Sequence, residues 1–131
     1  MEKIVQFLKD CKMFFLATSD GDQARVRPMG FVMVYEGKLC FATSNNKPMF
    51  RQMKANPKVE LCATMPDGKT LRVSGSVGFL STRDAKEKAL EVAPQLKRMY
   101  SADDGLFEVF RLENGIAVFS DMAGNREEMT F

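Results

Sequence analysis

The sequence predicts a mainly β protein of the α+β class: a small antiparallel barrel of six or seven strands with about three short helices. Short segments in which apolar and polar residues alternate are separated by tight turns rich in Asp, Gly and Asn. Other segments place apolar residues at the spacing of one helix face. The 131 residues contain no repeat, low-complexity tract or linker, so residues 1–131 are expected to form a single domain.

The first part of the chain predicts one helix followed by three strands. Charged residues alternate with apolar residues at helical spacing over residues 2–11, which indicates an amphipathic helix. A strand over 13–19 comes next, and an extended segment covers 24–35. Pro28 cannot donate a ladder hydrogen bond, so this segment is expected at a sheet edge or a bulge. The turn YEGK then leads back into a strand over 38–44.

The middle of the chain predicts a short helix and two strands. The helix is expected over 48–55, where it begins at a proline and ends before Asn-Pro. Strands over 59–65 and 70–80 follow, with the tight turn PDGK between them. Gly75 falls on the apolar side of the second strand, which predicts a bulge or a close approach of another backbone.

The last part of the chain predicts two short helical pieces and a hairpin. Ser81, with Asp84 three positions later, is expected to cap a helix, and Pro94 to begin a second helical piece. Asn114-Gly115 lies between the apolar alternations LFEVFRL and IAVFS, which predicts a hairpin turn. A final short strand is expected over 126–131.

The composition removes several classes of active site. The chain has no histidine, so Ser-His-Asp and Cys-His nucleophile systems and the usual zinc constellations are excluded. Cys11, Cys40 and Cys62 are odd in number and far apart, which argues against a disulfide framework; buried, inert thiols are expected. If the protein is an enzyme, a cofactor is therefore expected to perform the difficult chemistry.

The sequence also predicts where the protein works. The N-terminal stretch MEKIVQFLKDCK carries charges throughout and lacks the apolar centre of a signal peptide. No apolar run approaches the roughly 18 residues that a membrane span needs. A cytoplasmic protein without a membrane partner is expected.

Positive charge is concentrated in one part of the chain. Between residues 25 and 58, seven basic residues accompany one acid, Glu36, although the net charge of the whole chain is only +2. The basic residues are Arg25, Arg27, Lys38, Lys47, Arg51, Lys54 and Lys58. This excess suits an anionic small ligand better than a nucleic acid, which usually meets a broader basic surface. A solvated basic face is the alternative.

Part of this region has the residue types of a phosphate cradle. Arg25 and Arg27 are two apart on a predicted strand, so they share a face. Thr43 and Ser44 end the next strand, and Lys47 precedes a helix whose first N–H groups are free. Arginine adds a planar, bidentate grip. The alternative is that the hydroxyls and amides of TSNN only cap the helix.

The motifs RxRPxG, FxTxxxK and NPxV occur in this order between Arg25 and Val59. In this order and spacing the chain resembles the FMN-binding proteins related to pyridoxamine 5′-phosphate oxidase, in the short branch near the nitroimidazole reductases. The resemblance extends over nearly the whole chain, through LRVSGSVGFLSTRDAKEKAL to DDGLFEVFRL. It implies a Greek-key split β-barrel that forms a homodimer, with FMN at the subunit interface.

The resemblance also implies roles for single residues. Arg25 and Arg27 would meet the FMN phosphate or the flavin edge. The residues that would contact the ring are Val26, Pro28 and Met29; those that would line the ribityl side are Phe41, Ala42 and Thr43. Ser44 and Lys47 would hold the phosphate. Three further residues would reach the partner's flavin: Thr70, Leu71 and Arg72.

The resemblance implies a small FMN-dependent oxidoreductase with an unidentified small-molecule substrate, in which the flavin carries the redox chemistry. No GxGxxG fingerprint is present, so NAD(P)H is expected only as a visiting reductant. Pyridoxamine phosphate oxidases proper end in a segment with Trp and Arg, whereas this chain has no Trp; the related nitroimidazole reductases often carry a histidine near the flavin. Two alternatives remain: a non-catalytic module that binds flavin or another planar cofactor such as haem, and pyridoxamine 5′-phosphate oxidation itself.

Overall fold

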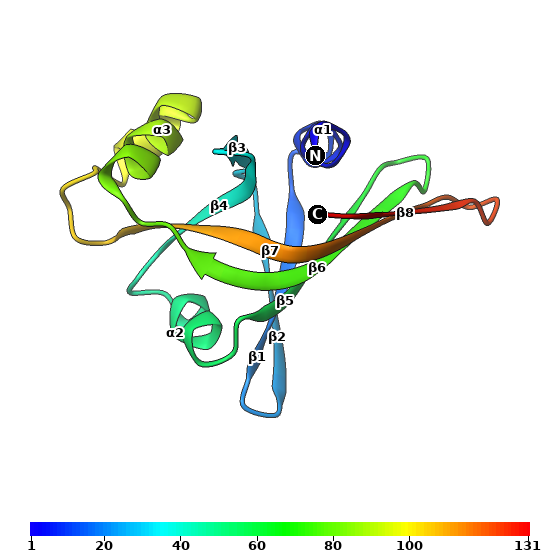
Figure 1. Cartoon of the computed structure of the whole chain (residues 1–131), viewed down its shortest axis with the longest axis horizontal. Helices are drawn as coiled ribbons and strands as arrows, with labels where there is room; N and C mark the ends of the chain where they lie inside the picture. Colours follow the sequence, from blue (N-terminus) through cyan, green and yellow to red (C-terminus); the bar gives the residue numbers. More distant parts are fainter.

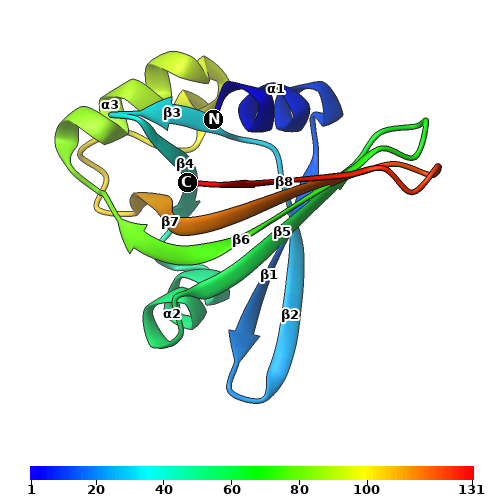
Figure 2. The same cartoon turned by 45° about the vertical axis from the view of Figure 1, so that its right-hand side comes forward.

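The computed structural model describes all residues 1–131 as a curved antiparallel sheet flanked by helices (Figures 1 and 2). The helices are α1 (Glu2–Cys11), α2 (Pro48–Ala55), α3 (Arg83–Val92) and the 3₁₀-helix η1 (Pro94–Arg98). The strands are β1 (Phe14–Asp20), β2 (Gln23–Met29), β3 (Met33–Tyr35), β4 (Lys38–Ser44), β5 (Lys58–Thr64), β6 (Thr70–Phe79), β7 (Phe107–Ser120) and β8 (Arg126–Thr130).

The strand order shows how the barrel is split. It runs β2-β1-β5-β6-β7-β4-β3, and β8 pairs with β7. β2 and β3 are consecutive in the chain, yet they form the two edges of this path. Only residues 30–32 connect them, and an extended chain over this distance spans at most about 14 Å. The sheet therefore curls until its edges approach each other, which confirms the mainly β split-barrel prediction.

The sheet has eight strands, against a prediction of six or seven. The segment predicted as one strand over 24–35 divides in two, because β2 ends at Met29 and pairing resumes at Met33. Gly30 lies at this break and passes close to the backbone of Lys12. A Cβ atom added to Gly30 would lie 3.4 Å from the Lys12 carbonyl oxygen. Pro28 lies on the edge strand β2, as its missing donor predicted.

The predicted hairpin at Asn114-Gly115 is wrong. β7 runs through both residues without turning, and its register against β6 shifts so that they oppose Gly75 alone. This is a β-bulge, and Asn114 has the positive φ of 51° that a hairpin turn would also require. The bulge predicted at Gly75 is confirmed, because an added Cβ there would lie only 3.0 Å from the Glu113 carbonyl oxygen.

Two apolar cores hold the helices in place. The larger core fills the barrel, and α1 contributes Ile4, Val5 and Leu8 to it. The smaller core lies under α3, which buries Ala85, Ala89 and Leu90 against β3, β4 and β7. This packing holds α3 and the following η1 beside the split edge of the sheet.

A helix cap, the cysteines and the helix lengths can each be compared with the sequence predictions. Thr82, not Ser81, caps α3 and accepts a hydrogen bond from the Ala85 N–H; Ser81 instead bonds the backbone of Val109. Among the cysteines only Cys40 is fully buried, and burial raises the pKa of its thiol to about 11. None of the helices has the length and apolar character needed to cross a bilayer.

Candidate functional site

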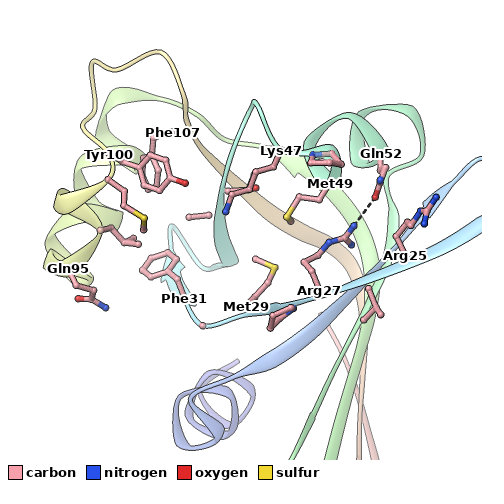
Figure 3. A pocket seen from close by; sticks show the side chains of 18 of the residues that line it. Arg25, Arg27, Met29, Phe31, Lys47, Met49, Gln52, Gln95, Tyr100 and Phe107 are labelled. Atoms are coloured by element: carbon pink, nitrogen blue, oxygen red, sulfur yellow. Dashed lines mark hydrogen bonds between the residues drawn. The ribbon is translucent and has the colours of Figure 1, made fainter.

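A cavity of about 930 Å³ opens at the split between β2 and β3 (Figure 3). This volume lies near the upper end of the range of small-molecule sites. Its wall is built from β1 and β2, the β2–β3 connection, the β4–α2 segment, η1 and the start of β7. The lining residues are Asp20, Arg25, Val26, Arg27, Pro28, Met29, Gly30, Phe31, Ala42, Thr43, Lys47, Pro48, Met49, Gln52, Gln95, Leu96, Met99, Tyr100 and Phe107.

Arg27 projects from β2 toward the cavity and is only half-buried. Its Nη1 donates to the Leu16 carbonyl oxygen at 3.1 Å and to Thr18 Oγ1 at 2.8 Å. Its Nη2 donates to Gln52 Oε1 at 2.8 Å (Figure 3). All these acceptors are neutral, and no carboxylate lies within ion-pair distance. Burial lowers the pKa of the guanidinium, a desolvation that an anionic ligand would offset.

Lys47 and Thr43 approach the cavity from the β4–α2 segment. Lys47 is the N-cap residue of α2, in an extended conformation, and its exposed ammonium forms no ion pair. Thr43 is only 4% exposed, and its Oγ1 is the one buried side-chain oxygen or nitrogen atom without a hydrogen-bond partner. A buried hydroxyl without a partner costs free energy, which a ligand could recover by bonding it.

The capping alternative for TSNN is wrong. No side chain caps α2. Ser44 Oγ instead donates to Asn46 Oδ1 at 2.7 Å, and Asn45 bonds the Gly105 carbonyl oxygen and Glu108. These bonds tie the segment to itself and to the loop before β7. Pro48 has no N–H and the Phe50 N–H donates to the Lys47 carbonyl oxygen at 3.1 Å, so the Met49 N–H is the donor left free at the start of α2.

The polar part of the cavity carries net positive charge. The charged lining residues are Arg25, Arg27 and Lys47 against Asp20, which leaves a balance of three minus one, or +2. Arg25 is exposed and pairs with Asp20 at 3.2 Å. Because that pair is half exposed, it contributes little to stability and can open for a ligand.

The opposite end of the cavity is mainly aromatic and was not predicted from the sequence. Phe31, Gln95, Tyr100 and Phe107 lie there, away from Arg25 and Gln52 (Figure 3). The rings of Tyr100 and Phe107 are 5.0 Å apart between centroids. The sequence does contain one indication of this wall, the helical spacing of Leu96, Met99 and Tyr100. The spacing alone does not show which surface these residues face.

Several predicted ligand residues lie outside this cavity. Phe41 is 1% exposed and packs in the larger core, and Leu71 is fully buried there. Ser44 is 1% exposed and does not line the cavity. Thr70 and Arg72 lie on β6; Thr70 lines a separate pocket, and exposed Arg72 is 3.6 Å from Glu60. In contrast, Arg25, Val26, Arg27, Pro28, Met29, Ala42, Thr43 and Lys47 all line the one cavity.

The family follows from a comparison with known proteins. A family model described as Pyridoxamine 5′-phosphate oxidase matches residues 1–115. The chain belongs to this family. The resemblance that the motifs indicated is thus confirmed. A search of curated proteins returned no match.

Several solved structures are similar to the chain over nearly its whole length. A NimC/NimA family protein from Clostridium acetobutylicum is 44% identical, with a TM-score of 0.97 over 100% of this chain and 92% of that one. A pyridoxamine 5′-phosphate oxidase-related, FMN binding protein from Nostoc punctiforme is 12% identical, with a TM-score of 0.61 over 99% and 93%. A heme binding protein from Mycobacterium smegmatis is 13% identical, with a TM-score of 0.71 over 94% and 57%. The last two share the fold alone.

Proposed function

We propose that the protein binds FMN in the cavity at the barrel split and acts as a small FMN-dependent oxidoreductase on a small-molecule substrate. The observation that carries the proposal is the convergence of Arg25, Arg27 and Lys47 on one cavity that also holds the unpartnered Thr43 hydroxyl. The family membership supports it, and the family includes a protein described as FMN binding.

The residues of the cavity fit a molecule that has a phosphate at one end and a planar ring at the other. Lys47, Arg25 and Arg27 would hold the phosphate through charge-assisted hydrogen bonds, and the Met49 N–H at the start of α2 would add one more donor. The Thr43 hydroxyl would bond the polar chain between phosphate and ring. Aromatic and thioether side chains at the apolar end suit a flat, polarisable ring system.

In this proposal the chain supplies position and electrostatics, and FMN when bound supplies the capacity to transfer electrons. The half-buried guanidinium of Arg27, with no carboxylate beside it, would favour negative charge on whatever lies against it. The apolar wall would exclude water from the ring. No histidine is present to move a proton, so another ionisable lining group, the substrate or solvent would have to do so.

The first test is the visible spectrum of the purified protein, followed by titration with FMN and FAD. About one FMN per chain is expected. FMN should bind about tenfold or more tightly than FAD, because the lining has only three cations, partly balanced by Asp20, which suits one phosphate better than two. Equal affinity for FMN and FAD would contradict the proposal, as would the absence of binding to either flavin. A screen of electron donors and acceptors on the FMN-loaded protein then separates an oxidoreductase from a non-catalytic flavin carrier.

We also propose that the protein is a homodimer, in which a second copy covers the outer face of the sheet. Phe15, Val26 and Ile116 are 48%, 68% and 41% exposed, and the strand register places them on this face. Large exposed apolar groups on one face commonly mark an interface. Val26 also lines the cavity, so a partner on this face would lie next to the ligand. Arg72, on the same face, would then be placed to reach the partner's flavin.

Light scattering is expected to give a dimer at micromolar concentration. The Phe15→Asp variant should shift the protein toward monomer, because it buries an unpaired carboxylate in the proposed interface. Met122→Asp is the matched control: Met122 is 84% exposed and does not belong to this face. A wild-type monomer with flavin bound would contradict the dimer, as would equal effects of the two variants.

A further inference from the structure

Gln52 takes part in a closed set of hydrogen bonds that the flavin assignment does not require. Its Oε1 accepts from Thr18 Oγ1 at 2.6 Å and from Arg27 Nη2 at 2.8 Å. Thr18 Oγ1 in turn accepts from Arg27 Nη1 at 2.8 Å. Thr18 is 4% exposed on β1, Arg27 lies on β2 and Gln52 on α2, so the three bonds join separate elements at the cationic end of the cavity.

The chemistry of these groups determines how the Gln52 amide lies. Arginine can only donate, so the amide oxygen rather than the nitrogen must face Arg27. The Thr18 hydroxyl accepts from Arg27 and therefore donates its one proton to the same oxygen. A carbonyl oxygen accepts two such bonds, so both of its positions are filled. If the Gln52 amide were rotated by 180°, its NH2 group would face the N–H groups of Arg27, and two donors would meet. The orientation of the Gln52 amide is therefore specified.

An amide at this position orients the guanidinium but does not neutralise it. A half-buried arginine is commonly paired with a carboxylate, which compensates its charge. Here the three acceptors of Arg27 are a backbone carbonyl, a hydroxyl and the Gln52 amide. The nearest alternative to Gln52 in shape is glutamate, which would make the same two contacts and cancel the charge.

We propose that Gln52 is a positioning residue that sets the charge selectivity of the cavity. It holds the Arg27 guanidinium toward the ligand while leaving its full positive charge available to an anionic group, the phosphate of FMN or a phosphate ion. The inference rests on the proposed function for the identity of the cofactor. The effect of the Arg27 charge does not depend on the flavin, so it can also be measured with inorganic phosphate.

The test compares Gln52→Glu with the wild type by calorimetric titration of FMN, riboflavin and inorganic phosphate. FMN and phosphate are expected to bind about tenfold more weakly to the variant, because its carboxylate neutralises Arg27. Riboflavin, which has no phosphate, should bind both proteins alike. The melting temperature should not fall, since the glutamate keeps both hydrogen bonds and adds an ion pair.

Two controls separate this role from a structural one. Gln95→Glu adds the same charge to the other end of the cavity (Figure 3) and should cost FMN affinity much less. In an Arg27→Met background, Gln52→Glu should change the FMN-to-riboflavin ratio less than it does in the wild type, because only the direct repulsion by the carboxylate is left once Arg27 is absent.

The outcomes that overturn the inference are specific. The first is that Gln52→Glu leaves the ratio of FMN affinity to riboflavin affinity unchanged. The second is that Gln95→Glu loses as much FMN affinity as Gln52→Glu does. The third is that Gln52→Glu changes the ratio as much in the Arg27→Met background as in the wild type. Failure of the proposed function looks different. If wild type binds phosphate but not FMN, the cofactor assignment falls, and the charge selectivity of Gln52 is still measured on phosphate.

Discussion

Lys47→Ala is expected to lower the affinity for FMN about ten- to hundredfold and to leave the affinity for riboflavin unchanged. The variant removes one charge-assisted contact to a phosphate, worth about 1.5–3 kcal/mol, which corresponds to this loss in binding constant. Lys47 is suited to this role because its ammonium lines the cavity, forms no ion pair and lies at the start of α2. Fluorescence titration of the two flavins against both proteins provides the measurement.

The fold should tolerate this change. Lys47 is exposed and makes no side-chain cap, and a positive charge at a helix N-terminus is slightly unfavourable. Lys54→Ala is the matched control, because Lys54 lies in the last turn of the same helix and outside the cavity, where its ammonium is 5.0 Å from the Phe50 ring centroid. Equal FMN affinity of wild type and Lys47→Ala would mean that Lys47 is only a surface residue.

Phe41→Ala is expected to destabilise the protein by about 3–5 kcal/mol, the usual cost of removing a fully buried phenyl ring. Phe41 is 1% exposed, with the Phe110 ring stacked 5.5 Å away and the Phe14 ring edge-on at 5.7 Å. No nearby side chain can fill the resulting space without breaking other contacts, since cores are packed densely. Urea denaturation of the flavin-free protein measures the free energy of unfolding.

This prediction also separates a core role from the ribityl contact that the resemblance implied for Phe41. A core residue predicts a large loss of stability, whereas a ligand contact predicts a loss of FMN affinity in a protein of normal stability. Phe50→Ala should cost less, because Phe50 is only partly buried and packs at the surface of α2 against Phe79. Less than about 1 kcal/mol of destabilisation in Phe41→Ala would contradict its core position.

Local patterns in the sequence predicted most of the elements well. The helix over 2–11 and the strand over 38–44 have the predicted bounds. Apolar residues recur every three to four positions in a helix and every two in a strand, and both patterns depend only on neighbours in the chain. The same locality explains the errors. Asn114-Gly115 has the positive φ that a hairpin requires, but only the paired strand β6 makes it a bulge. The break at Gly30 depends on the curvature of the whole sheet.

The sequence by itself determined the cationic half of the candidate site, since Arg25 with Arg27 and Thr43 with Lys47 are each close in the chain and carry phosphate-binding chemistry. The tertiary structure decided which residues meet them. β2 and β4 are not paired with each other; they meet only because the barrel curls and splits between β2 and β3. That closure brings Gln52 from α2 to Arg27 and adds the aromatic wall of η1, while it turns Phe41 into the core. Such contacts join residues far apart in the chain, and they follow from packing and strand register rather than from any local preference.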